Sequence, residues 1–154
     1  MKTDPSVEGV RYTLAEYCQT FDDSRSDDWA NLFCVDGEFS IDQLGELRGR
    51  ALITQFVDEA TRALADAGIS GVNHQTFNSM ITISGGRAES HSDWALAVPA
   101  GQGFATAVLG RYHDELVFTD RWRFQRRHIT WFHHTMPPAL EAALRPIFAQ
   151  HVPA

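Results

Sequence analysis

The spacing of apolar residues changes once along the chain, and this change limits the folds that the chain can adopt. Before residue 74, three segments repeat their apolar positions with the period of a helix. After it, segments with period two are separated by Gly-Gly, Pro-Ala-Gly-Gln-Gly and Thr-Asp-Arg breaks. Helices followed by an antiparallel meander indicate an α+β fold, in which one curved sheet wraps over N-terminal helices.

The pattern places the individual elements. Ser24 and Asp27 have the spacing of a capping box, which predicts a short helix that buries Trp29, Leu32 and Phe33. The predicted elements are a helix over 9–23, this short helix, a strand over 38–42, a loop or short strand between Gly45 and Gly49, a helix over 50–67, strands over 74–84, 87–98, 104–118 and 122–132, and a final helical segment over 139–151 interrupted at Pro146.

One domain accounts for the chain length. A chain of 154 residues with an ordinary globular composition, 44% hydrophobic and 21% charged, can bury a core of its own. We expect a single domain over 1–154 with its core at about 9–133. The segment 134–154 is the candidate cap of a pocket at the open end of the sheet.

Charge and hydropathy argue against several classes of protein. The net charge of −7 and the scattered basic residues argue against a nucleic-acid-binding protein. The one basic run, 121–127, alternates with Trp122 and Phe124, as in a strand with one face in water. Cys18 and Cys34 have no metal-binding spacing. No apolar run could span a bilayer and no signal peptide is recognisable, so we expect a cytoplasmic protein without a membrane partner.

The first predicted helix supplies a candidate for chemistry. Its apolar stripe includes Tyr17 and Phe21, and Asp22 lies at the edge of that stripe. A carboxylate half out of water can have its pKa raised toward a value useful for acid–base catalysis. The alternative is a carboxylate that only lies near the helix end, before the Asp-Ser-Arg-Ser turn.

Several motifs occur in a characteristic order. They are Tyr17 with Asp22, DDWANLFCVDGEF at 27–39, Gly49 before the third helix, NHQTFN at 73–78, the hairpin GGRAESHSDW, GRYHDEL at 110–116 and WRFQRR at 122–127. In this order they resemble the nuclear-transport-factor-2-like superfamily, in its SnoaL-like branch. The resemblance implies a cone-shaped α+β barrel. Because the branch includes scytalone dehydratase, a bile-acid dehydratase, polyketide cyclases and small subunits of ring-hydroxylating dioxygenases, fold alone does not decide function.

The resemblance also implies a set of catalytic residues. Dehydratases of this group use a first-helix Asp and a strand His as an acid–base pair, with a Tyr on the same helix; Asp22, His74 and Tyr17 occupy similar positions. Elimination of water next to a carbonyl needs one group to remove an acidic C–H and another to protonate the leaving hydroxyl. A phenol can polarise the carbonyl oxygen. The implied reaction is a cofactor-independent dehydration of a hydrophobic cyclic hydroxy-ketone of polyketide, terpenoid or steroid type.

Strand alternation conflicts with part of this assignment. Phe77 shares a face with the apolar residues that follow it, so strict period two places His74 on the opposite face. His74 reaches a pocket only if a β-bulge lies between His74 and Phe77, or if the strand begins after His74. His91, a secondary candidate, has the same difficulty and points outward, toward solvent or a subunit interface.

The remaining expectations concern the pocket and the partners. Phe21, Phe56, Trp94 and Tyr112 are the expected pocket-lining residues. His128, His133 and His134 form a histidine cluster that no Cys or acidic ligand joins, so we predict a surface cluster and no metal site. Outward Arg and His residues on the long strands favour a homo-oligomer, a dimer or a trimer.

Two alternatives to a dehydratase remain open. An isomerase or cyclase would use the same pocket, because Asp or His can shuttle a proton in those reactions as well. A non-catalytic module that binds hydrophobic ligands, or an accessory subunit, would have the pocket without the chemistry.

Overall fold

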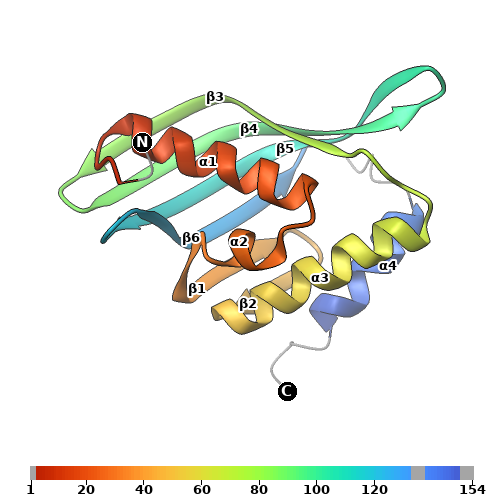
Figure 1. Ribbon diagram of the computed structural model, residues 1–154, viewed down its shortest axis with the longest axis horizontal. Coiled ribbons are helices and arrows are strands. Elements are labelled where there is room, and N and C mark those ends of the chain that lie inside the picture. Colours follow the sequence, from red (N-terminus) through yellow and green to blue (C-terminus); the bar gives the residue numbers. More distant parts are fainter. Residues whose placement is uncertain (1–2, 133–137, 150–154) are drawn as a thin grey trace.

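A computed structural model describes residues 3–132 and 138–149 and contains one curved sheet with helices packed against one face (Figure 1). The elements are α1 (Val7–Asp22), α2 (Ser26–Ala30), β1 (Phe33–Ile41), β2 (Gly45–Arg48), α3 (Arg50–Asp66), β3 (Asn73–Ser84), β4 (Arg87–Ala100), β5 (Gly103–Phe118), β6 (Trp122–Trp131) and α4 (Pro138–Ala149). The strand order is β2-β1-β6-β5-β4-β3. All neighbouring pairs are antiparallel except β1 and β6, which are parallel. The predicted α+β class is confirmed.

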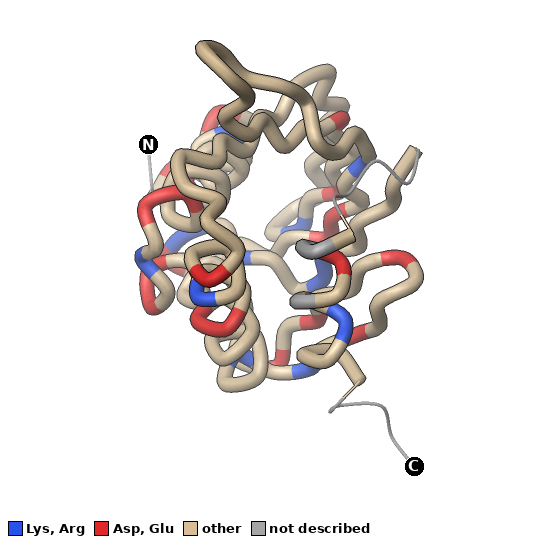
Figure 2. The backbone as a smooth tube through the Cα atoms, turned by 90° about the vertical axis from the view of Figure 1, so that its right-hand side faces the viewer, with Lys and Arg blue, Asp and Glu red and all other residues tan. Residues whose placement is uncertain are grey.

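The sheet does not close into the barrel that the resemblance implied. β2 and β3 form its two edges, and no strand pairing among the described residues joins them. Helices lie where closure would have occurred, since α1 packs against β3 and α3 packs against β1 and β2. Figure 2 shows this arrangement from the end of the molecule, with the sheet curving around the helices.

The predicted capping box at Ser24 is wrong. Ser24 has a φ of +56° and closes α1: its N–H donates to the Phe21 carbonyl, and the Arg25 N–H donates to the Thr20 carbonyl. This pair of bonds is a Schellman motif, whose left-handed residue cannot also take the extended conformation of an N-cap. α2 therefore begins after Arg25, without a side-chain cap.

Three other boundaries differ from the sequence pattern. β1 begins at Phe33 rather than at 38, because Phe33 pairs with Phe124 of β6, a contact that leaves no local signal. Pro99 does not end its strand: it pairs with Phe104 in a two-stranded hairpin beyond the start of β3, where no neighbouring strand needs its missing N–H. Pro146 lies inside α4 and is exposed, so the carbonyl that it leaves unpaired can be hydrated.

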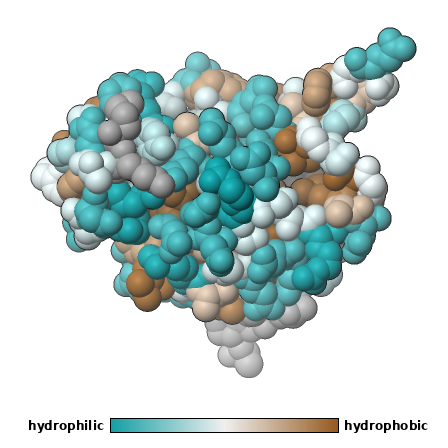
Figure 3. Space-filling model, in the orientation of Figure 1, coloured by the Kyte–Doolittle hydropathy of each residue, from teal (hydrophilic) through white to brown (hydrophobic). Residues whose placement is uncertain are grey.

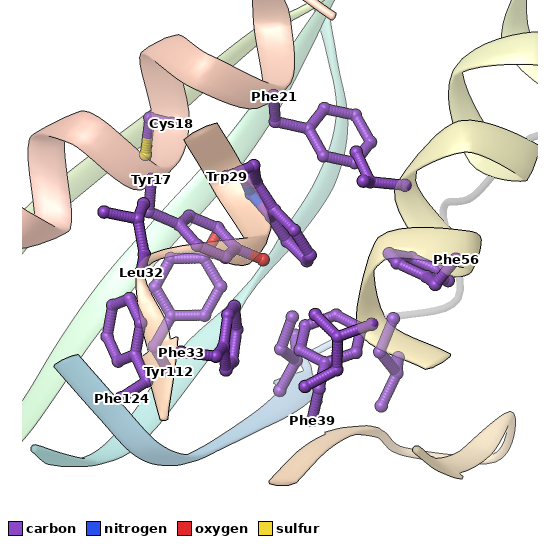
Figure 4. Packing of buried hydrophobic residues seen from close by; sticks show 14 of the residues in the cluster. Tyr17, Cys18, Phe21, Trp29, Leu32, Phe33, Phe39, Phe56, Tyr112 and Phe124 are labelled. Carbon is purple, nitrogen blue, oxygen red and sulfur yellow. The ribbon is translucent and has the colours of Figure 1, made fainter. Parts of the chain in front are cut away.

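A cluster of aromatic rings fills the space between the helices and the sheet (Figure 4). Trp29 of α2 lies at its centre and contacts the rings of Tyr17, Phe21, Phe39 and Phe56 at centroid distances of 5.0–6.0 Å. Trp29, Leu32 and Phe33 are buried as predicted. The cluster fixes α1 and α3 relative to β1, and this fixes the positions of the side chains that they contribute to the site.

The hydropathy and the charge of the surface differ between the helical face and the β4–β5 hairpin. The face that carries the helices is largely hydrophilic, and the β4–β5 hairpin extends beyond the body of the molecule (Figure 3). The segment 95–110, which includes this hairpin, contains no charged residue and is uniformly tan in Figure 2.

Among the described residues, none of the helices combines the length and apolarity needed to cross a membrane.

Candidate active site

Asp22 and His74 are in contact although they lie 52 positions apart in the chain. Asp22 ends α1 and His74 is the second residue of β3. The Asp22 Oδ1 lies 2.6 Å from the His74 Nδ1, and its Oδ2 accepts a 2.9 Å bond from the His74 backbone N–H. Both side chains are only 12% exposed. Because a carboxylate accepts at Nδ1, that nitrogen carries the proton and Nε2 is left as the reactive nitrogen.

An apolar cavity of about 60 Å³ lies beside the His74 ring. The ring stands edge-on to Phe21, at 4.8 Å between centroids, and nearly parallel to Trp94, at 6.1 Å. Tyr17, His74 and the four expected lining residues all border the cavity, together with Phe39, Ile41, Ala60, Leu64, Leu96, Ile129, Trp131 and Leu144. Asp22 does not border it. Its carboxylate faces a polar groove of about 290 Å³ between α1 and β3, so His74 separates the groove from the cavity.

A β-bulge turns His74 inward, but its position differs from the prediction. The pairing of β3 with β4 shifts between Phe77 and Met80, where Asn78 has a φ of +51°. The extra residue reverses the alternation, so His74 lies on the same face as Ile81, and Phe77 is 39% exposed on the other face. The prediction of a bulge between His74 and Phe77 is therefore wrong by a few residues.

Tyr17 projects from α1 into the aromatic cluster, where Figure 4 shows its hydroxyl directed toward Trp29. The side chain is 4% exposed. Burial raises the pKa of Tyr17 above its ordinary range, although the Arg127 guanidinium opposes this shift. The phenol is therefore neutral at physiological pH and keeps its hydroxyl proton, so it can act as a hydrogen-bond donor.

An ion pair that the sequence does not predict lies beneath Tyr17. Arg127 donates from Nε and Nη2 to the two carboxylate oxygens of Asp114, both at 2.7 Å, and both side chains are fully buried. The guanidinium lies 3.9–4.2 Å from the ring centroids of Tyr17, Tyr112 and Phe124. The sequence pattern predicts that the basic run at 121–127 lies on a strand with its arginines facing water. For Arg127 this prediction is wrong.

The reason is a second irregularity in strand pairing. The register of β5 and β6 shifts between Glu115 and Leu116, so Arg127 lies on the same face as Phe124 although the two residues have opposite parity. Asp114 could have been found from the sequence, because it alternates with Tyr112 on the inner face of β5. Arg127 could not, since a shift in register between two strands has no local signature.

Gly110 makes room for the wall of the cavity, and this gives a testable prediction. A Cβ at Gly110 would lie 2.0 Å from the Thr130 carbonyl oxygen and 2.6 Å from the Trp94 Nε1. We expect Gly110→Ala to destabilise the fold by about 1–3 kcal/mol and to change tryptophan fluorescence, because Trp94 must move. Gly103→Ala is the matched control, since nothing lies within 4 Å of its Cβ position. Equal urea midpoints for the two variants would contradict this account.

The other histidines lie away from the cavity. His91 is exposed on the sheet face opposite the helices, as alternation predicted, and contacts His113 at 3.1 Å between Nδ1 atoms. His128 bonds to Ser40 and lies 3.1 Å from Asp42. The other two members of the predicted histidine cluster, residues 133 and 134, lie outside the described residues.

The chain matches a known protein family over most of its length. A family model described as a SnoaL-like domain matches residues 5–128. The chain belongs to the SnoaL-like domain family. This confirms the resemblance to the nuclear-transport-factor-2-like superfamily that the motifs carried. No curated protein matches this SnoaL-like chain.

Solved structures of low sequence identity share the fold of this SnoaL-like protein. A variant of Rv3472 from Mycobacterium tuberculosis, described as a protein of unknown function, is 20% identical, with a TM-score of 0.79 over 93% of this chain and 86% of that chain. A putative scytalone dehydratase from Novosphingobium aromaticivorans is 20% identical, with a TM-score of 0.69 over 82% and 83%. ActVI-ORFA from Streptomyces coelicolor is 21% identical, with a TM-score of 0.70 over 82% and 97%. At these identities the likeness concerns the fold.

Proposed function

We propose that this SnoaL-like protein is a cofactor-independent dehydratase acting on a small hydrophobic cyclic hydroxy-ketone. The observation that carries the proposal is the His74 imidazole, fixed by the Asp22 carboxylate at Nδ1 and bordering an apolar cavity. An imidazole held at Nδ1 by a carboxylate, with its ring beside an apolar cavity, is suited to moving a proton. SnoaL-like proteins generally bind small hydrophobic ligands, which agrees with the lining of the cavity.

The proposed reaction is an elimination in two proton transfers. His74 Nε2 removes the proton from the carbon beside the ketone, and the electron pair moves onto the carbonyl oxygen as an enolate. The Tyr17 hydroxyl donates a hydrogen bond to that oxygen, while Asp22 stabilises the imidazolium. The imidazolium then protonates the hydroxyl on the next carbon, its C–O bond breaks, and a conjugated enone and water are formed.

The cavity must widen before a cyclic substrate can enter. Pockets for small organic ligands usually enclose about 300–1,000 Å³, which far exceeds the 60 Å³ found here. Leu144 of α4 borders the cavity, and Phe148 of the same helix packs on Phe39 and Phe56. We therefore propose that α4, which lies within the segment 134–154, caps the cavity and shifts to admit substrate.

The proposal is tested with a panel of cyclic β-hydroxy ketones of increasing size. We expect at least one to be converted with the rise of enone absorbance and with the loss of one water from the substrate mass. Conversion at unchanged mass would identify an isomerase or cyclase and overturn the dehydratase assignment. Saturable binding without conversion of any panel member would favour a non-catalytic ligand-binding protein.

A further inference from the structure

A block of four side chains, two histidines and two glutamates, lies on the sheet face opposite the helices, away from the candidate active site. It is formed by β4 and β5, which are adjacent in the sheet (Figure 1). Two successive rungs on one face pair Glu89 with Glu115 and His91 with His113. The four side chains line one groove of about 370 Å³. We propose that this block binds a divalent transition-metal ion such as Zn²⁺.

The spacing of the two imidazoles fits a shared ion. The Nδ1 atoms of His91 and His113 lie 3.1 Å apart, with the two rings nearly perpendicular. At a metal–imidazole distance of about 2.05 Å, nitrogens 3.1 Å apart subtend an angle of about 98° at the metal. This angle lies between the octahedral and tetrahedral values, so both nitrogens can reach one ion once the proton of the hydrogen bond between them is displaced.

The carboxylates supply a second, independent reason. Glu89 and Glu115 are directly opposite each other across two antiparallel strands and are both exposed. Like charges at directly opposed positions destabilise a strand pair, and a bound cation removes that repulsion. Among the described residues no group of three or more ligands is already arranged around a metal position. The two imidazoles therefore form the anchor, and a glutamate or water completes the coordination after side-chain rotation.

The charges around the block act in both directions. Glu89 and Glu115 favour a cation, because both carboxylates line the groove. Arg126 opposes binding, because it lines the groove and lies 3.9 Å from the Glu115 carboxylate. His128 lies beside the block, but its two nitrogens contact Ser40 and Asp42. It is the matched control.

The test is calorimetric titration of the tag-free, reduced protein with Zn²⁺, in a Cys34→Ser background so that the half-buried thiol does not compete. We expect one ion per chain and an affinity lowered at least about tenfold by His91→Asn or by His113→Asn. His128→Asn should leave the affinity within about threefold, and Arg126→Gln should increase it. Thermal unfolding without metal should be similar for all variants, because the substituted side chains lie on the solvent face.

Two results would overturn the proposal. One is the absence of stoichiometric binding, which would reduce the His91–His113 contact to a hydrogen bond between imidazoles. The other is an equal loss of affinity in His128→Asn, which would indicate adventitious binding to surface histidines. Neither result bears on the dehydratase assignment, since the block and the cavity share no lining residue.

Discussion

Replacing His74 by glutamine is expected to lower kcat by about 10²–10⁴-fold on any substrate that the panel identifies. Glutamine approximates the size of the imidazole and can still bond to the Asp22 carboxylate, but it cannot take up and release a proton near neutral pH. Because the apolar lining that holds the substrate is unchanged, KM should change much less than kcat. Steady-state kinetics of the purified variant measures both constants.

The control for this variant is His128→Gln. His128 lies on the opposite face of the sheet and does not border the cavity, so its replacement should leave kcat at the wild-type value. Thermal unfolding of both variants separates a chemical effect from a folding effect. A His74→Gln protein that unfolds like the wild type and turns over at the wild-type rate would remove His74 from the reaction.

Replacing Arg127 by methionine is expected to destabilise the fold by about 3–5 kcal/mol, because it leaves the fully buried Asp114 carboxylate without its partner. Although burial alone would lower the pKa of Arg127, the Asp114 carboxylate raises it above its ordinary value, so the guanidinium is charged in the folded protein. Urea unfolding measures the loss. Arg126→Met is the matched control, since Arg126 is exposed and its loss should cost no more than about 0.5 kcal/mol.

The double variant Asp114→Leu, Arg127→Met distinguishes a lost pair from lost packing. A buried ion pair replaced on both sides by apolar residues is often neutral or stabilising by about 1–4 kcal/mol. We therefore expect the double variant to be more stable than Arg127→Met alone. If the double variant loses as much stability as the two single variants summed, the interaction between the two charges is not what makes Arg127→Met destabilising.

The motifs and the periodicity were sufficient for most of the fold. The helix over 50–67 and the four long strands were predicted within a few residues, because each has a strong repeating pattern and a turn at its end. The errors lie where a boundary depends on a distant partner. β1 begins at Phe33 through pairing with β6, and Ser24 ends one helix instead of beginning the next.

The sequence by itself determined the α+β class, which depends on periods and turn residues, and it indicated the family through the order of its motifs. The helix pattern made Asp22 a candidate, and the resemblance to the family added Tyr17 and His74. Only the tertiary structure decided which face of the sheet His74 occupies and that Arg127 is buried. Both depend on shifts of strand register, at Phe77/Met80 and at Glu115/Leu116. One extra residue in a strand moves every later side chain to the other face, and pairing between whole strands determines where that residue lies.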